Sequence, residues 1–359
     1  MHTPDDPARR RILAASLAAL GAAALPALRR RVRADRALPG LPRSKVLAIV
    51  VAVMAHTLVR VGNDEYQRSN GDCCTPKNAP PPLRPPPPSP PTHPPPLRAA
   101  PASAVVVDGA VYVVDCGNGV ARQLALAGLR LGALRGVFVT HHHSDHNADY
   151  GNLLLLAWAA DLRTPVDAWG PPPLKRMTRQ FLRLNATDIR TRIADEGRVD
   201  PATLIRAHEL RAGGEVVRDE RVRVRAAVVE HPPLKPAFAY RFDTADRSIV
   251  FSGDTRPSAA LIELARGADV LVHEVMYLPA LEKLIASEAQ AARLRQHLLE
   301  SHTTAEQVGR VASEAGVKTL VLNHFVPGGD PALTDDVWRA AVAPHFKGEL
   351  VIGRDLLEL

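Results

Sequence analysis

Short apolar runs alternate with amphipathic segments from about residue 104 to the end of this 359-residue chain. Residues 104–107 and 110–114 are rich in valine and flank Asp108-Gly109, a pair typical of a tight β-hairpin. Further apolar runs predict strands at residues 134–140, 222–230, 248–252, 270–274, 318–322 and 349–352. Helical patterns fill the gaps between these runs, and this order predicts a layered α/β protein.

The clearest helical pattern covers residues 304–315. Thr303 and Glu306 have the spacing of a capping box at its start, and Gly316 ends it. Residues 174–213 are rich in arginine and in helix-forming residues, so we expect a helical insertion on the surface there.

The pattern is lost between residues 37 and 101, because 14 of the chain's 32 prolines lie between Pro76 and Pro101. Proline interrupts helices and sheet ladders, so we expect a disordered or polyproline segment rather than an SH3-type ligand. The apolar run from Val46 to Val59 is too short to cross a bilayer, which favours a buried strand or an unstructured remnant over a stable membrane span. The folded domain is therefore predicted to cover residues 102–359.

Positive charge is concentrated at the start of the chain, whose formal net charge is +7 overall. Residues 1–36 hold eight arginines and three aspartates, which leaves 37 basic and 35 acidic side chains in the other 323 residues. The overall charge is thus weak support for a nucleic-acid partner. Arg9-Arg10-Arg11 before an Ala/Leu stretch is typical of a twin-arginine export signal and predicts a periplasmic location, with an uncleaved amphipathic helix as the alternative.

One histidine-rich segment follows the predicted strand at 134–140 and has the spacing His141-x-His143-x-Asp145-His146. Neutral imidazole nitrogens and carboxylate oxygens are the ligands that zinc-type ions prefer. Residues two apart in an extended segment project to the same side, so His141 and His143 can hold one ion together. Asp145 and His146 lie where the chain turns away and can reach a second ion, so the segment predicts a two-metal site rather than a chance polyhistidine cluster.

Four other polar residues lie beside predicted strand ends or a helix start, namely His231, Asp254, His302 and His324. Each of them alone would more often be structural. Because strand carboxyl ends gather at one sheet edge, where α/β proteins keep their sites, we expect these residues to join the histidine cluster.

The motifs VVDCGNG, THHHSDHN, FSGDT, VHEV, SHTTAEQ and LNHF together resemble the metallo-β-lactamase superfamily. Within it they are similar to the ribonuclease Z-like branch, which also contains arylsulfatase-type hydrolases. The resemblance covers about residues 104–359 and implies a four-layer αββα sandwich. It also implies a set of ligands: His141, His143 and His231 for a first metal, Asp145, His146 and His324 for a second, Asp254 as a bridge, and Asp115 to orient a ligand.

The implied chemistry uses two divalent ions, with zinc as the default and manganese or iron as alternatives. The ions acidify a shared water, and the resulting bridging hydroxide attacks a sulfuryl or phosphoryl centre. Asp145 both ligates and accepts the proton of the attacking water, while His302, oriented by Glu274, protonates the leaving oxygen. His273 is expected on the opposite face of its strand and His142 is not expected to be a ligand.

The resemblance departs from the family at residues 45–101, where the family has a strand followed by a glycine-rich turn. Here the segment begins suitably at Lys45 but then becomes proline-rich. A genuine insertion and a frameshifted stretch of the gene are both open at this point, as is the formation of the N-terminal strand.

Three functions are compatible with these motifs. The first expectation is an exported dinuclear hydrolase of the arylsulfatase-like kind, whose partner is a small-molecule sulfate or phosphate ester. The alternative is a ribonuclease Z-type tRNA 3′-processing endonuclease, and the third is a metal-binding protein that has lost activity. The export signal and the lack of a basic Gly/Pro-rich arm place a nucleic-acid substrate second, and the bridging carboxylate at Asp254 disfavours a lactamase. The resemblance also implies a homodimer.

Overall fold

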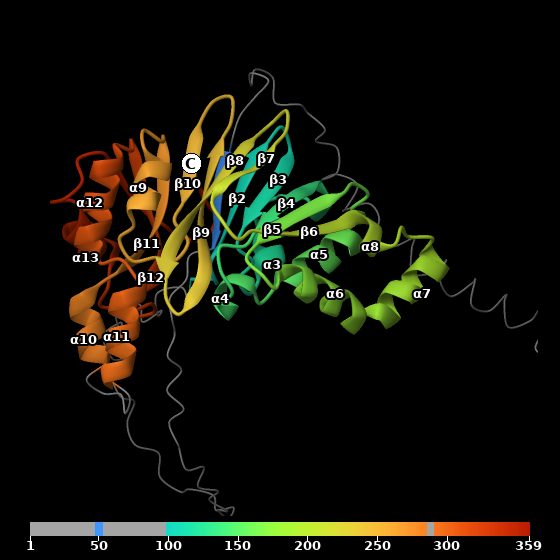
Figure 1. Cartoon of the computed structure of the whole chain (residues 1–359), viewed down its shortest axis with the longest axis horizontal. Coiled ribbons are helices and arrows are strands. Elements are labelled where there is room, and N and C mark those ends of the chain that lie inside the picture. Colours follow the sequence, from blue (N-terminus) through green and yellow to red (C-terminus); the bar gives the residue numbers. More distant parts are fainter. Residues whose placement is uncertain (1–46, 53–97, 286–290) are drawn as a thin grey trace, which may run out of the picture. The chain divides into compact units, whose positions relative to one another are not determined.

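Two seven-stranded β-sheets lie face to face in the computed structural model, which describes residues 47–52, 98–285 and 291–359 (Figure 1). The strands of the first sheet, in spatial order, are β14 (Leu357–Glu358), β1 (Leu47–Ala52), β2 (Ala102–Val107), β3 (Ala110–Val114), β4 (Leu134–Phe138), β5 (Val166–Gly170) and β6 (Ile205–Glu209). Those of the second sheet are β13 (Glu349–Ile352), β12 (Thr319–Val326), β11 (Val270–Met276), β10 (Ser248–Phe251), β9 (Leu234–Asp243), β8 (Arg223–His231) and β7 (Gly214–Arg218).

The helices fall into two groups along the chain. Those before β6 are α3 (Val120–Leu126), the 3-10 turn η1 (Leu131–Ala133), α4 (Ser144–Asn147), α5 (Tyr150–Ala159), α6 (Leu174–Leu184), α7 (Ala186–Glu196) and α8 (Pro201–Leu204). Those after β10 are α9 (Ala259–Ala265), α10 (Leu278–Ile285), α11 (Ala291–Ser301), α12 (Ala305–Ala315) and α13 (Asp335–Val342).

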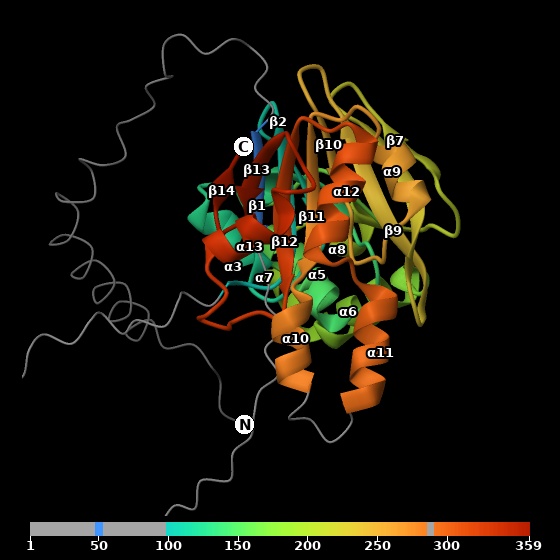
Figure 2. The same ribbon diagram turned by 90° about the vertical axis from the view of Figure 1, so that its left-hand side faces the viewer.

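Helices cover the outer face of each sheet (Figures 1 and 2). On the first sheet, α3 and α5 pack through a buried apolar cluster that includes Val120 and Leu153. On the second sheet, α9, α12 and α13 pack through Leu261, Val308 and Trp338. The layers therefore follow the order helix, sheet, sheet, helix, which confirms the expected four-layer αββα sandwich.

The hairpin strands β2 and β3 are buried on both faces because successive side chains of a strand point in opposite directions. Val105 and Tyr112 belong to the core between the two sheets, whereas Ala104 and Val113 belong to the core under the helices. Phe138 ends β4 inside the inter-sheet core and is fully buried. The burial of such runs explains why they are almost continuously apolar in the sequence.

Strand direction brings several carboxyl ends to one edge of the sandwich. In the first sheet β3, β4 and β5 are parallel, and in the second β10, β11, β12 and β13 are parallel. Strand β8 has the same direction as β10, because β9 between them is antiparallel to both. The residues that follow β3, β4, β8 and β10 can therefore meet at this edge.

The predicted hairpin is confirmed, since β2 pairs with β3 across Asp108-Gly109. Strands β5, β6, β7, β9 and β14 were not predicted. The predicted surface insertion at 174–213 is helical from α6 to the end of α8 at Leu204, and β6 follows directly. Polar side chains occupy much of β6 and β7 because both are edge strands, which removes the apolar signal of a buried strand.

Helix α12 confirms the predicted helix, but its capping box lies one residue later than expected. The side chain of Thr304 accepts a hydrogen bond from the backbone N–H of Gln307, and the Gln307 side chain accepts one from the backbone N–H of Thr304. The hydroxyl of Thr303 instead donates to the carbonyl oxygen of Thr255 at 2.6 Å. Thr303 is therefore committed to a tertiary contact beside the site described below.

Strand β1 lies inside the segment 37–101 that was expected to be disordered. Its six residues pair antiparallel with β2 and with β14, so disorder does not hold for residues 47–52, and of the two outcomes expected for the run Val46 to Val59 they form the strand. The leader at 1–36 and most of the proline-rich segment lie outside the described residues. Within the described residues, no helix is long and apolar enough to cross a membrane.

Candidate metal centre

Eight potential metal ligands meet at the edge where the strand ends converge. Seven of them are the ligands expected from the sequence: His141 and His143 after β4, Asp145 and His146 on α4, His231 at the end of β8, Asp254 after β10, and His324 on β12. The eighth is His302, directly after α11, which forms a group with Asp254 and His324. Their ligand atoms form overlapping groups in which the atoms lie within 4.8 Å of one another.

His141, His143 and His231 form the first group together with Asp254. Nδ1 of His143 lies 3.1 Å from Nε2 of His141 and 3.0 Å from Nε2 of His231. Oδ2 of Asp254 lies 3.8 Å from Nε2 of His141. Nitrogens that share one tetrahedral zinc ion at about 2.0–2.1 Å lie roughly 3.3 Å apart, so these separations fit a common cation.

Asp145, His146 and His324 form the second group. Oδ2 of Asp145 lies 3.5 Å from Nε2 of His146 and 3.3 Å from Nε2 of His324. Oδ1 of Asp254 lies 3.2 Å from His146 Nε2, and its Oδ2 lies 3.3 Å from His324 Nε2. Asp254 therefore contacts both groups, as a bridging carboxylate must.

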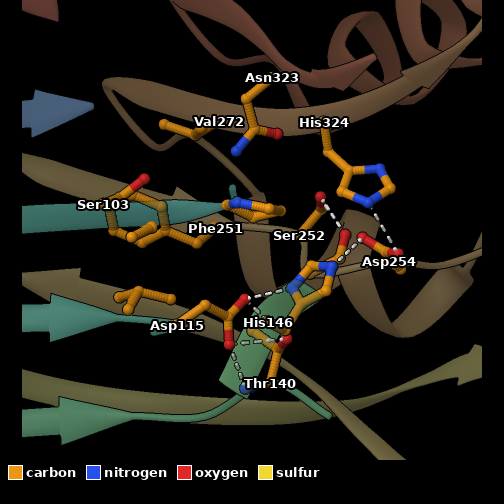
Figure 3. A pocket seen from close by; sticks show the side chains of 14 residues that line it. Ser103, Asp115, Thr140, His146, Phe251, Ser252, Asp254, Val272, Asn323 and His324 are labelled. Carbon is orange, nitrogen blue, oxygen red and sulfur yellow. Dashed lines mark hydrogen bonds and ion pairs between the residues drawn. The ribbon is translucent and has the colours of Figure 1, made fainter. Parts of the chain in front are cut away.

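Figure 3 shows Asp115, His146, Asp254 and His324 around one small cavity of about 20 Å³ between the sheets. Nε2 of His146 and Oδ1 of Asp254 are buried here, in an orientation that makes no hydrogen bond with any described residue. A buried carboxylate oxygen and a buried ring nitrogen in this state cost free energy unless a cation binds them. The imidazole and carboxylate donors therefore fit a divalent ion of the zinc type.

Hydrogen bonds behind the ligands fix which ring nitrogen faces the centre. Nδ1 of His146 lies 2.8 Å from Oδ2 of Asp115. Oδ1 of the same carboxylate accepts the backbone N–H of Thr140, and its Oδ2 accepts the Thr140 hydroxyl. Nδ1 of His231 donates to the carbonyl oxygen of Ser301 at 2.8 Å. Partners of this kind set the tautomer of a ligating histidine and hold its ring in place.

His324 lies within β12, at a break in the pairing with β11, rather than after the strand as the sequence suggested. Glu274 pairs with Asn323 and Val275 pairs with Phe325, so His324 is the extra residue of a β-bulge. Its φ of 42° is in the left-handed region that non-glycine residues rarely adopt. The bulge turns the ring of His324 toward Asp145 and Asp254, and this backbone strain is local to the site.

The charges around the centre favour an added positive charge. Burial works to raise the pKa of the Asp254 carboxyl, but His146 and His324 hold it well below its ordinary value. Burial works to lower the pKa of His146, but Asp254 and Asp115 raise it well above its ordinary value. The buried acids thus stabilise a cation at this position, and a bound metal ion would take the place of those protons.

His302 and Glu274 form a buried pair beside the two groups. Nδ1 of His302 lies 2.7 Å from Oε2 of Glu274, and Oε1 of Glu274 accepts the backbone N–H of Thr255 at 2.6 Å. Burial opposes charge on both partners, because it raises the pKa of Glu274 and lowers that of His302 to about 4. Nδ1 of His302 also lies 4.0 Å from Oδ2 of Asp254, so the pair borders on the ligands.

The structure brings together every residue that the sequence analysis placed in the site, although their roles as ligands and catalysts stay predictions. His273 is buried with Nδ1 2.7 Å from the carbonyl oxygen of Glu274, and His142 contacts the carbonyl oxygen of Pro171 at 2.8 Å, so neither ring belongs to the ligand groups. The sequence analysis missed His297 on α11, whose ring lies 6.3 Å from that of His143.

It also missed the supporting contacts of Thr140, Ser301 and Thr255. Two of these contacts use backbone atoms, which carry no signal in the sequence. Thr140 could have been noticed, because a hydroxyl directly before the ligand run is within reach of its neighbours.

Comparison with known proteins gives the same family and identifies similar proteins within it. The sequence model of the β-lactamase superfamily domain matches residues 111–325. Ribonuclease Z of Mycobacterium sp. (strain KMS) is 36% identical over 258 residues, which cover 71% of this chain and 88% of that protein. Ribonuclease Z of Mycobacterium bovis (strain BCG / Pasteur 1173P2) is 34% identical over 259 residues, which cover 71% of this chain and 90% of that protein.

Among solved structures, human tRNase Z, short form, aligns with a TM-score of 0.55 and 18% identity over 87% of this chain and 98% of that chain. The metallo-β-lactamase fold protein YhfI of Bacillus subtilis aligns with a TM-score of 0.55 and 16% identity over 88% and 98%. At these identities the two structures support the fold alone.

The relatives overturn the expectation of an arylsulfatase-like hydrolase, because sequences 34% and 36% identical to this chain are ribonucleases Z. The expectation was wrong for a physical reason. Sulfate and phosphate esters both present tetrahedral oxyanions, so the ligands themselves do not distinguish them. The preference for a small ester rested instead on the leader, which lies outside the described residues, and on the lack of a basic Gly/Pro-rich arm.

Proposed function

The chain belongs to the β-lactamase superfamily and to its ribonuclease Z-like branch, and we propose that it is a metal-dependent endonuclease that hydrolyses phosphodiester bonds at the 3′ end of tRNA precursors. One observation carries the proposal. The ligand groups and the His302–Glu274 pair converge at one edge of the sandwich, within residues 111–325 that match the β-lactamase superfamily domain.

We propose two divalent ions, with zinc as the first choice. His141, His143 and His231 would hold one ion, Asp145, His146 and His324 the other, and Asp254 would contact both. Bound there, the ions supply Lewis acidity toward a phosphoryl oxygen and acidify water. The remaining steps depend on side chains of this chain.

Asp145 is the carboxylate best placed to accept a proton from attacking water. Its side chain is 11% exposed, against 1% for Asp254, so it is the more accessible of the two ligating carboxylates. Burial works to raise its pKa, but the hydrogen bond from His324 and the neighbouring His146 lower it overall. Asp145 is therefore ionised, and its proposed role as the proton acceptor rests on its accessible position rather than on its basicity.

His302 is placed to give a proton to the leaving oxygen. Because Oε1 of Glu274 accepts the backbone N–H of Thr255, only Oε2 shares a proton with Nδ1 of His302. When the His302–Glu274 pair holds two protons, the first is the one shared between Oε2 and Nδ1. The second must then lie on Nε2, the ring nitrogen that does not face Glu274. Such proton transfer contributes about 10²–10⁴ in rate.

The third alternative, a protein without activity, rested on a damaged N-terminal region. Strand β1 pairs with β2 and β14 as part of the first sheet, which removes that ground.

Three substrates offered side by side to the zinc-loaded protein test the proposal: a tRNA precursor with a 3′ extension, a bis-aryl phosphate and an aryl sulfate. We expect cleavage of the precursor, slower hydrolysis of the bis-aryl phosphate and no hydrolysis of the aryl sulfate. The Asp254→Ala variant serves as the control for contaminating nucleases. Hydrolysis of the aryl sulfate without cleavage of the precursor would refute the proposal.

The periplasmic location and the homodimer stay predictions. A reporter fused behind residues 1–36 tests the first: its export would separate the protein from tRNA precursors, which are made in the cytoplasm, and would count against the proposed substrate. Sedimentation of the purified protein tests the second.

A further inference from the structure

One face of α6 carries a stripe of four exposed cationic side chains, Lys175, Arg176, Arg179 and Arg183. Three of them are spaced four residues apart, so they lie one above the other along the helix. None of the four forms an ion pair with a described residue. On the next helix of the insertion, α7, Arg192 does form ion pairs, with Asp188 and Glu196. We call these four residues the α6 stripe.

The stripe is a local feature and not part of a general excess of positive charge. Beyond the leader, the chain has nearly equal numbers of basic and acidic residues, and α6 itself has no acidic residue. Like charges crowded on one helix face repel one another, although Arg183 in the last turn is favoured by the helix dipole. Their arrangement therefore suits an anionic partner.

Helix α6 is held against the segment that carries the metal ligands. The ring of His142, between ligands His141 and His143, contacts the carbonyl oxygen of Pro171, three residues before α6 begins. The hydroxyl of Tyr150, at the start of α5, lies 2.7 Å from that of Thr178 on the buried face of α6. These contacts fix the position of the stripe relative to the centre.

Close packing reinforces this position. A Cβ atom placed on Gly151 would lie 2.2 Å from the ring of Phe181, so the ring rests directly on the backbone of α5. Figure 1 shows α6 beside α5 and beyond α4 on the outer side of the first sheet. Helix α6 thus begins three residues after a contact with the ligand segment, and Lys175 lies in its first turn.

The dimensions of the stripe fit a phosphate backbone. A rise of eight residues of α-helix separates Lys175 from Arg183, about 12 Å, which is long enough to span several consecutive phosphates of one nucleic-acid strand. The four cations can therefore face several phosphates in a row. Arginine and lysine are the side chains that most often make such contacts.

We propose that the α6 stripe binds the phosphate backbone of the RNA substrate and holds the RNA while one phosphodiester lies at the metal centre. This inference rests on the proposed function and names a surface of this chain for the RNA substrate. The stripe contacts phosphates and no base edges, so it adds affinity without sequence preference.

Binding of a tRNA precursor to the zinc-loaded full-length protein tests the proposal, with the dissociation constant measured at several salt concentrations. We expect the double variant Arg176→Gln/Arg179→Gln to bind on the order of tenfold more weakly at 0.1 M salt, and the slope of log Kd against log salt concentration to fall by about two. The variant Arg176→Lys/Arg179→Lys keeps the charges and should bind nearly as the wild type does.

The matched control is Arg310→Gln/Lys347→Gln, which removes two exposed cations on the side of the second sheet. It should leave the dissociation constant and its salt slope unchanged, and equal zinc content in all variants shows that the fold is kept. Equal weakening by the control would overturn the proposal, because it would show an effect of net charge alone. So would a wild-type affinity in the α6 variant.

Vesicles of phosphatidylserine and phosphatidylcholine test the other anionic surface that a basic helix could meet. The proposal would be overturned if the α6 variant alone lost binding to these vesicles while its affinity for RNA stayed unchanged. The failure of this proposal can be told apart from the failure of the proposed function. If the wild type cleaves the precursor and the α6 variants bind it normally, only the RNA-binding role of the α6 stripe is refuted. A wild type that neither binds nor cleaves RNA refutes both.

Discussion

The carboxylate of Asp115 lies 2.8 Å from Nδ1 of His146, so a residue that follows β3 fixes the ring of a histidine on α4. The same carboxylate accepts the backbone N–H of Thr140 at 2.8 Å, directly before the first ligand. The Asp115 carboxylate thereby links Thr140, directly before the histidine-rich segment, to His146 within it. The φ of 62° at Asp115 shows that the backbone bends sharply to bring the carboxylate there.

We predict that Asp115→Asn weakens metal binding about 10–100-fold without removing a ligand. An amide has one acceptor oxygen, so it cannot serve both His146 and Thr140, and the ring of His146 loses its fixed tautomer. Zinc affinity, measured by competition with a chelator, checks this. The control Asp167→Asn also removes a carboxylate from a histidine, His208, but lies away from the centre and should bind zinc normally.

The roles of Asp254 and His302 should separate cleanly. Asp254→Ala removes the oxygens that contact both ligand groups and should lose metal. His302→Ala should keep its metal and lose about 10²–10⁴ in turnover, because its proposed role is proton transfer. Metal content and single-turnover cleavage, measured on the same preparations, distinguish the two. Equal metal loss in both variants would contradict this division.

Phe138 should be among the most costly side chains to truncate. Its ring is fully buried, stacks on Trp169 at 4.8 Å and meets the edge of Phe242 at 5.0 Å. Phe138→Ala would leave a cavity between the sheets and lower the free energy of unfolding by about 3–5 kcal/mol. Urea denaturation checks the value, and Phe138→Leu should cost clearly less; similar costs would argue against tight packing.

Asp269 should make stability depend on pH in the acid range. Its carboxylate accepts bonds from Lys318 at 2.7 Å and from the backbone N–H of Ser248 at 2.7 Å. Burial works to raise its pKa, but Lys318 and Ser248 lower it from 3.8 to about 2. A lowered pKa stabilises the fold while the group is ionised, so the contribution is present above about pH 4 and is lost as the pH falls toward 2.

Urea midpoints of the wild type and of Asp269→Asn at pH 6, 4 and 2.5 test this. The gap between the two proteins should be widest at pH 6 and shrink toward pH 2.5. A gap that is the same at all three values would show that the carboxylate charge contributes nothing.

The hairpin and the gathering of the site residues could be predicted because their signals are local. Asp108-Gly109 specifies its turn directly, and His141 and His143 are neighbours in one short motif. The whole sandwich required the family resemblance, since no local pattern orders the fourteen strands of the described residues. Strand β9 was missed because Pro236 near its start is typical of a turn.

Tertiary contacts explain the other misses. The bulge at His324 arises from its pairing with β11, and the bond from His231 to the carbonyl of Ser301 joins residues 70 positions apart. The α6 stripe was visible in the sequence as an arginine-rich helical stretch. Its placement beside the ligands was not, because that depends on the contacts of His142 and Tyr150.

The central claim is that these seven ligands form a two-ion centre that cleaves RNA. Titration of the metal-free protein with zinc, while cleavage of a labelled tRNA precursor is followed, tests it most directly. We predict that cleavage develops with the second equivalent of zinc and is absent in Asp254→Ala at any zinc concentration. Full cleavage by the metal-free protein, or none with both equivalents bound, would contradict the claim.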